Sequence, residues 1–122
     1  MKINRRKFLK SASATAAVMA APAFISQTQA ANSLKMAVIL DQSGGLDIYG
    51  RPMVDASHLA IEEINAAGGL LGKQVELTVY DPQSTIQFYT QYATKAATSD
   101  RVDVVQAGIT SASRESIRPL LN

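Results

Sequence analysis

The hydrophobic pattern changes its period repeatedly between residues 31 and 122, and this alternation constrains the fold more than any other feature of the sequence. Leu34 to Leu40 form a nearly continuous apolar run that ends at Asp41-Gln42-Ser43-Gly44-Gly45, a pattern typical of a buried strand leading into a glycine-rich loop. Helical spacing follows over about residues 52–67, because Pro52 suits a first turn and Gly68-Gly69 suits a C-cap. The predicted inner face of this helix comprises Ala56, Leu59, Ala60, Ile64 and Ala67.

The alternation continues toward the C-terminal end. Val75 to Tyr80 alternates apolar and polar residues and stops at Asp81-Pro82, which predicts a second strand. Ser84 is a candidate N-cap for a helix over about residues 85–99, whose sheet-facing residues are Ile86, Tyr89, Ala93 and Ala96. A third strand is expected at residues 102–105, followed by a short helix that Ser111 or Ser113 caps and Pro119 limits.

This order of elements predicts an α/β fold, a parallel sheet with helices on both faces in the order βαβαβα. Three strands make a partial sheet with an edge that awaits more chain. Residues 31–122 are also fewer than in a typical domain. We therefore expect an incomplete domain that belongs to a longer protein and has limited stability alone.

The first 30 residues have the organisation of a removable export signal. The basic cluster Asn4-Arg5-Arg6-Lys7 precedes Phe8-Leu9 and a modestly apolar stretch that is too short and too rich in Ala, Ser and Thr for a membrane anchor. Small residues in Thr28-Gln29-Ala30 predict cleavage between Ala30 and Ala31. The arginine pair resembles the bacterial twin-arginine motif, which the twin-arginine export machinery reads; an ordinary secretory signal is the alternative. Both interpretations place the mature chain in the periplasm or beyond.

Removal of this signal reverses the sign of the net charge. Five of the 12 basic residues and none of the 10 acidic residues lie within residues 1–30, which leaves 7 basic against 10 acidic side chains. No basic stripe remains to neutralise phosphates, which argues against a nucleic-acid partner. The sequence has no cysteine, which excludes disulfide bonds and a lipid anchor on a cysteine.

Two loops are expected at the carboxyl ends of the strands, where open parallel sheets bind ligands. The first ends at Tyr49, whose ring can cover a small ligand or can simply be a partly exposed loop aromatic. The second, residues 108–113, leads into a helix whose free N–H groups, with the Ser111 hydroxyl, can hold a carboxylate or carbonyl oxygen. The simpler alternative is that Ser111 and Ser113 only cap that helix.

Patterns typical of catalytic, nucleotide and metal sites are missing from the sequence. His58 is the only histidine and has no candidate metal partner nearby, so it is expected on the surface or in packing. The phosphate-binding glycine spacings and the G-x-S-x-G nucleophile motif do not occur. We expect a protein that is not an enzyme and needs neither a cofactor nor a metal.

A series of short motifs in a fixed order resembles the motifs of a known protein family. These motifs are Met36-Ala37-Val38-Ile39, Ser43-Gly44, Tyr49-Gly50, Ala60-Ile61-Glu62-Glu63-Ile64-Asn65-Ala66-Ala67-Gly68-Gly69, Leu71-Gly72-Lys73, Tyr80-Asp81-Pro82 and Gly108-Ile109-Thr110-Ser111-Ala112-Ser113-Arg114, with Pro119. They resemble the opening of type I periplasmic solute-binding proteins, above all those for branched-chain amino acids, short-chain amides and urea. The likeness covers essentially all of residues 31–122.

The resemblance implies the N-terminal lobe of a two-lobed protein that closes on a small solute and passes it to an ABC transporter permease. On this pattern Tyr49, Ile109, Thr110 and Ser111 contact the ligand, and Ser113 is a weaker candidate. The string from Thr110 to Arg114 favours the urea and amide branch, but some amide binders carry an aromatic residue in the place of Ile109. The alternatives are an exported α/β enzyme and a ligand-sensing receptor domain, with functional residues beyond Asn122.

Overall fold

A computed structural model describes residues 33–121, and the export signal predicted for residues 1–30 lies outside them. Three parallel strands form one sheet, in the order β2-β1-β3. The central strand is β1 (Ser33–Ile39), and its neighbours are β2 (Gln74–Tyr80) and β3 (Val104–Ala107). At the carboxyl end of β1, Ile39 is paired with Tyr80 on one side and with Ala107 on the other.

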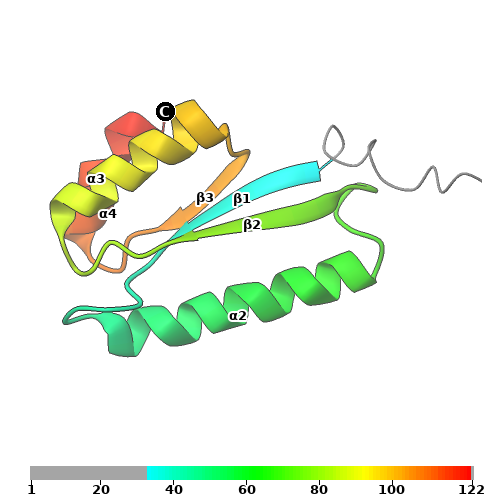
Figure 1. Ribbon diagram of the computed structural model, residues 1–122, viewed down its shortest axis with the longest axis horizontal. Helices are drawn as coiled ribbons and strands as arrows, with labels where there is room; N and C mark the ends of the chain where they lie inside the picture. The colour runs from blue at the N-terminus through cyan, green and yellow to red at the C-terminus, as the bar shows by residue number, and fades with distance from the viewer. Residues whose placement is uncertain (1–32, 122) are drawn as a thin grey trace, which may run out of the picture.

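Helices cover both faces of this sheet (Figure 1). Helix α2 (Asp47–Ala66) lies on one face, and α3 (Ile86–Lys95) and α4 (Ser111–Ile117) lie on the other. Helix α3 continues as a π-helical turn, η1 (Ala96–Asp100), and α4 continues as a 3-10 turn, η2 (Arg118–Leu120). The predicted α/β fold is confirmed. No helix within residues 33–121 is long and apolar enough to cross a membrane.

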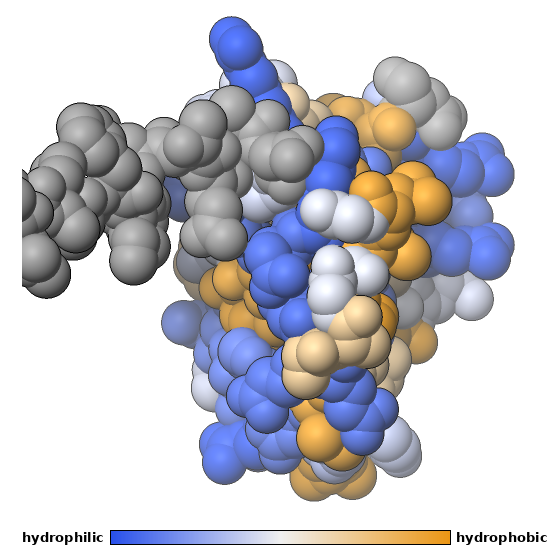
Figure 2. Space-filling model, turned by 90° about the vertical axis from the view of Figure 1, so that its right-hand side faces the viewer, coloured by the Kyte–Doolittle hydropathy of each residue, from blue (hydrophilic) through white to orange (hydrophobic). Residues whose placement is uncertain are grey.

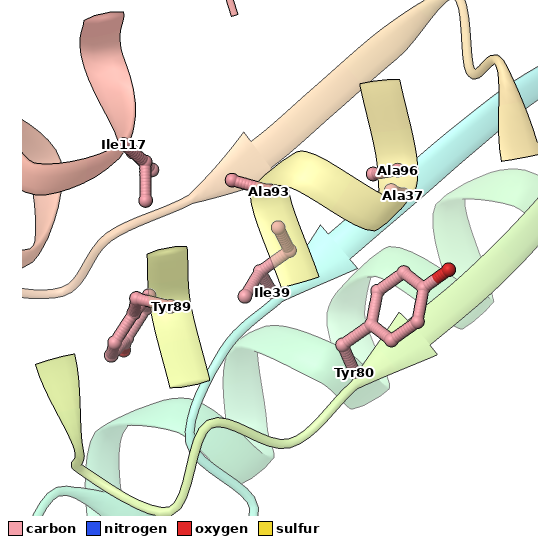
Figure 3. Packing of buried hydrophobic residues seen from close by; sticks show 7 residues of the cluster. All are labelled: Ala37, Ile39, Tyr80, Tyr89, Ala93, Ala96 and Ile117. Atoms are coloured by element: carbon pink, nitrogen blue, oxygen red, sulfur yellow. The ribbon is translucent and has the colours of Figure 1, made fainter. Parts of the chain in front are cut away.

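Two apolar layers, one on each face of the sheet, form the core. The layer under α3 and α4 contains Ala37, Ile39, Tyr80, Tyr89, Ala93, Ala96 and Ile117 (Figure 3). The layer under α2 contains Val38, Leu40 and Val54, with partly buried Met36, Leu77, Val79 and Ile109 against it. Because β1 is covered on both faces, its apolar residues run without the alternation seen in β2.

Helix α2 differs from the prediction at its start and in its inner face. It begins at Asp47, so Pro52 lies inside the helix and not in its first turn. The buried positions after the first turn are Val54, Ser57 and Ile61, whereas the predicted Ala56, Leu59, Ala60 and Ala67 are exposed. The apolar periodicity missed Ser57, which is buried because its hydroxyl donates to the Met53 carbonyl oxygen at 2.7 Å and contacts Gln106 Oε1 at 3.0 Å.

The end of α2 follows the prediction. Gly68 and Gly69 have φ values of +104° and +84°, in the left-handed region that ends many helices. The Gly69 N–H donates to the Ile64 carbonyl oxygen at 2.8 Å. The Asn65 side chain then bonds both the N–H and the carbonyl of Val75, at 2.8 and 2.9 Å, which joins the end of α2 to β2.

Two further boundaries and one inner-face residue differ from the prediction. Thr85, not Ser84, is the N-cap of α3, because the Ser84 hydroxyl accepts a hydrogen bond from the distant Leu46 N–H at 3.0 Å. Strand β3 begins at Val104, two residues later than expected, after Arg101 takes a left-handed conformation with φ of 51°. Of the predicted inner face of α3, Tyr89, Ala93 and Ala96 are buried, but Ile86 is 41% exposed.

Candidate functional site

The strand order brings three loops together at the carboxyl edge of the sheet. The chain leaves β1 toward β2 on one side, while β3 lies on the other side, so the loops after β1 and β3 flank the point where the strand order changes direction. We call this region the rim: the loops at residues 40–46, 81–85 and 108–110, with the first turns of α2 and α4. All of them lie at the left-hand end of the molecule in Figure 1.

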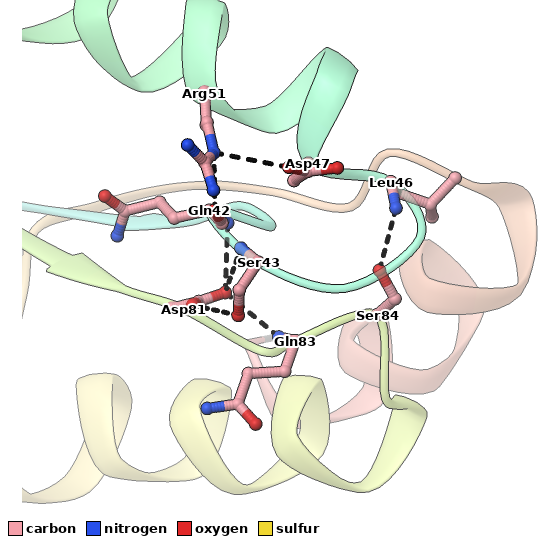
Figure 4. A network of polar contacts seen from close by, with 8 residues as sticks. All are labelled: Gln42, Ser43, Leu46, Asp47, Arg51, Asp81, Gln83 and Ser84. Atoms are coloured by element: carbon pink, nitrogen blue, oxygen red, sulfur yellow. Dashed lines mark hydrogen bonds and ion pairs between the residues drawn. The ribbon is translucent and has the colours of Figure 1, made fainter.

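Asp81 holds the loop after β1 against the loop after β2 (Figure 4). Its carboxylate accepts the Ser43 hydroxyl at 2.6 Å and the backbone N–H groups of Gln42, Ser43 and Gln83 at 3.0 to 3.3 Å. Partial burial alone raises the pKa of Asp81, but the hydrogen bonds from Ser43 and from the backbone outweigh it, so the net pKa is lowered. The carboxylate therefore stays ionised and joins the two loops.

Arg51 bonds the same loop at Gln42, beside the contacts of Asp81. The Arg51 Nε donates to the Gln42 carbonyl oxygen at 2.7 Å and lies 3.4 Å from an Asp47 carboxylate oxygen, one helical turn earlier (Figure 4). This exposed ion pair is weak by itself, but it ties the start of α2 to the loop. At the other end of the loop, the Ser84 hydroxyl accepts the Leu46 N–H, so side chains hold the loop at both of its ends.

Tyr49 lies in the first turn of α2 and not in a loop, and it is 56% exposed. At Gly50, the backbone of α2 comes close to that of Asp41, in the loop after β1. A Cβ atom on Gly50 would lie 1.8 Å from the Asp41 carbonyl oxygen. The helix therefore presents Tyr49 on the rim from a rigid element.

The N-cap of α4 is Thr110, so neither predicted residue is the N-cap, but Ser113 takes part in capping from the third position of the helix. The Thr110 hydroxyl accepts the Ser113 N–H at 3.1 Å, and Ser113 Oγ accepts the Thr110 N–H at 3.1 Å, which is a capping box. Ser113 is 1% exposed, and its hydroxyl also donates to the Thr110 carbonyl oxygen at 2.9 Å. Ser113 therefore supports the loop from within, and its direct contact with a ligand stays a prediction that this geometry does not favour.

The other predicted residues of this loop lie at its surface or on the core. Ser111 is the first residue of α4 and is exposed. Thr110 is also exposed, and Ile109 packs against the apolar layer under α2. Together with Tyr49 on α2, these residues belong to the same rim, but nothing in the structure tests whether they contact a ligand.

Two buried residues beneath the rim were missed by the sequence reasoning. Asp41 is 0% exposed; its Oδ1 accepts the Ser84 N–H at 2.6 Å and its Oδ2 accepts the Tyr89 hydroxyl at 2.8 Å. The available signals were an aspartate directly after a buried strand and a tyrosine on the predicted inner face of a helix, whose hydroxyl needs a partner.

The opposite end of the molecule is polar but occupied by its own contacts. Figure 2 shows this end, where hydrophilic side chains lie between hydrophobic groups. Between this end and the rim, on the face of the sheet under α3, Lys95 lies 3.8 Å from Asp100 and 5.0 Å from the centre of the Tyr80 ring, and the Tyr80 hydroxyl donates to Asp100. His58 is on the surface, and residues 33–121 contain no group of three His, Cys, Asp or Glu side chains placed to hold a metal. The rim is therefore the stronger candidate for a ligand site.

Comparison with known proteins identifies a family that matches the described residues. The family profile described as "Periplasmic binding protein domain" matches residues 34–122, and the profile "TAT (twin-arginine translocation) pathway signal sequence" matches residues 2–22. A "Leucine-, isoleucine-, valine-, threonine-, and alanine-binding protein" of Pseudomonas aeruginosa is 38% identical over 65 residues, which cover 53% of this chain and 17% of that protein.

Solved structures match the fold over most of the described residues. A branched-chain amino acid transporter substrate binding protein from Streptococcus pneumoniae, in complex with isoleucine, has 32% identity and a TM-score of 0.68, covering 70% of this chain and 24% of its own. A leucine binding protein from Thermotoga maritima has 30% identity and a TM-score of 0.65, covering 71% and 24%. The chain thus spans about a quarter of the length of these structures.

Proposed function

The chain belongs to the periplasmic binding protein domain family, and from that premise we propose that it is part of the solute-binding protein of an ABC transporter. The match to a twin-arginine signal, together with the domain match, makes it an exported, periplasmic protein. The proposal includes cleavage between Ala30 and Ala31, with residues 31–122 forming part of an N-terminal lobe. The partners are a membrane permease, which takes up the solute, and the twin-arginine export machinery. A transporter component that binds and releases its solute unchanged is not an enzyme.

The observation that carries the proposal is the rim itself. Loops from three parallel strands meet at the ligand-binding edge expected for this sheet order, and side-chain hydrogen bonds fix them before any ligand arrives. We propose that Tyr49, Ile109, Thr110 and Ser111 contact the solute, with Ser113 behind them. In this arrangement the polar loop before α4 binds the carboxylate or carbonyl end of the solute.

We propose an aliphatic amino acid as the solute, ahead of urea or a short-chain amide. The proteins at 30% identity or more are named for branched-chain and related aliphatic amino acids, and one of them holds isoleucine. The motif from Thr110 to Arg114, which favours the amide branch, is the argument for the second class. Both classes share a planar carboxylate or amide head that fits the same hydrogen-bonding loop.

Ligand-dependent thermal stabilisation of the full-length protein tests this function. Leucine, isoleucine and valine are expected to raise the melting temperature, because a ligand at 100 times its Kd stabilises the folded state by about 2.7 kcal/mol. Lysine and glutamate are the control solutes and are expected to leave the melting curve unchanged. A response to urea or acetamide alone would reassign the solute class, and no response to any of these solutes would contradict the proposed function.

Replacing Ser111 with alanine tests the proposed contact at the start of α4. The change is expected to weaken solute binding by about 1–2 kcal/mol, since it removes a hydroxyl that pairs with a buried polar group of the solute. Isothermal titration calorimetry measures the effect, with Ser99→Ala as the matched control because Ser99 is an exposed serine in η1, at the opposite end of the sheet. An unchanged affinity would leave Ser111 as a helix residue without a role in binding.

A further inference from the structure

Directly beneath the rim lies a buried carboxylate that contacts none of the proposed solute-binding side chains. Asp41 follows the central strand and is 0% exposed, and it forms no salt bridge among residues 33–121. Burying an aspartate in a protein interior is unfavourable unless hydrogen bonds compensate for the lost water. A buried aspartate at this position therefore indicates a role that an apolar residue could not perform.

The two oxygens of Asp41 join two different parts of the rim. Oδ1 accepts the Ser84 N–H at 2.6 Å, in the loop after β2. Oδ2 accepts the Tyr89 hydroxyl at 2.8 Å, from the inner face of α3. The carboxylate thus sets the spacing between the end of β1, the loop after β2 and α3.

Tyr89 extends this connection to the loop after β3. Its side chain is 1% exposed and lies in the apolar layer that also contains Ile117 of α4 (Figure 3). Burial, and then the hydrogen bond and negative charge of Asp41, raise the pKa of Tyr89, so its hydroxyl stays protonated and donates. Helix α3, which carries Tyr89, packs directly on α4, the helix that Thr110 and Ser113 cap.

The backbone of Asp41 also fixes the position of α2. Helix α2 packs so closely on it that a Cβ on Gly50 would overlap the Asp41 carbonyl oxygen. Tyr49, the residue before Gly50, therefore takes its position from the same aspartate. The start of α2 thus touches Asp41, and α4, which follows the loop at residues 108–110, packs on the apolar layer that contains Tyr89.

We propose that Asp41 and Tyr89 are positioning residues of the solute site. Their carboxylate–phenol pair holds the loops at residues 81–85 and 108–110 and the start of α2 in the arrangement that binds solute. This inference rests on the function proposed above. A purely stabilising role is the alternative, and an apolar pair of similar volume often stabilises a core equally well or better, without imposing hydrogen-bonded spacing.

Tyr89→Phe in the full-length protein tests the proposal, with leucine as the probe in isothermal titration calorimetry. Removing only the hydroxyl is expected to weaken leucine binding about tenfold, the size of effect typical of a lost hydrogen bond to a charged group. Tyr92→Phe is the matched control: Tyr92 lies one turn further along α3, and its ring stacks on Tyr80 at a centroid distance of 5.0 Å. Its affinity is expected to stay within about twofold of the unmodified protein. Asp41→Asn, which removes the charge and keeps the size, is expected to match Tyr89→Phe and serves if that variant does not fold.

Amide hydrogen exchange supplies a readout that needs no solute. In Tyr89→Phe, the amides of Ser84 and of residues 109–113 are expected to exchange faster, while those of β1 keep their protection. Weaker binding together with faster exchange in these loops supports the proposal. Unchanged affinity and unchanged loop exchange would overturn it, and so would a uniform loss of protection with normal affinity, which indicates a purely structural role. A protein that binds no solute but shows the selective loop exchange would refute the proposed function and retain the coupling of the loops.

Discussion

Gly50→Ala is expected to destabilise the protein by about 3 kcal/mol or more. The added Cβ would lie 1.8 Å from the Asp41 carbonyl oxygen and 2.8 Å from the Asp41 nitrogen. These are backbone atoms, so no side-chain rotation relieves the overlap, and α2 must move away from β1. Urea unfolding of the full-length protein measures the loss.

Gly45→Ala is the matched control for this change. Gly45 lies in the same loop, but a Cβ there would meet nothing within 4 Å. Its stability is expected to stay within about 0.5 kcal/mol of the unmodified protein. Because α2 carries Tyr49, Gly50→Ala is also expected to reduce solute affinity. Equal stabilities for the two variants would show that α2 does not depend on close contact with Asp41.

Asp81→Asn is expected to cost about 2–3 kcal/mol of stability, because it removes the charge from an acceptor of four hydrogen bonds. The amide cannot accept through its nitrogen, so the Ser43 hydroxyl or a backbone N–H loses its partner. Asp55→Asn, an exposed position on α2, is the control and is expected to change stability by less than about 0.5 kcal/mol. Comparable losses in both variants would contradict the role of Asp81 in joining the loops.

The pH dependence of the same variant follows from the sign of the pKa shift. The pKa of Asp81 is lowered from its ordinary value of 3.8 in the folded state, so its contribution is fully present above that value. It is lost as the pH falls through the lower pKa of the folded state. Unfolding curves between pH 7 and acid conditions are expected to show a smaller loss for Asp81→Asn than for the unmodified protein. An identical acid dependence would contradict the lowered pKa.

Strands and helices could be predicted where burial produces a regular pattern of apolar residues in the sequence. The run from Leu34 to Leu40 is apolar except at Lys35 because helices cover both faces of β1, and Val75 to Tyr80 alternates because β2 is exposed on one side. The end of α2 at Gly68-Gly69 could be predicted because the left-handed conformation favours glycine. These signals depend on residues close in the chain.

The errors arose where a residue depends on a partner far along the chain. The start of α2 depends on how Gly50 approaches Asp41, and the role of Ser84 depends on Leu46 and Asp41, at separations of 38 and 43 residues. Ser57 is buried because Gln106 lies across from it, on β3. A periodicity that scores polar residues as exposed misses such pairs.

The sequence by itself therefore determined the order of elements, the α/β class, the export signal and the family motifs. Each of these depends only on the composition and spacing of residues that are close in the chain. Only the tertiary structure decided which side chains of the rim are exposed and which form hydrogen bonds within the protein. It showed that Thr110 and Ser113 cap each other, that Tyr49 stands on a helix, and that Asp41 and Tyr89 meet beneath the loops. The physical reason is that hydrogen bonds are short and directional. Their partners are fixed only when packing brings distant segments within about 3 Å of one another.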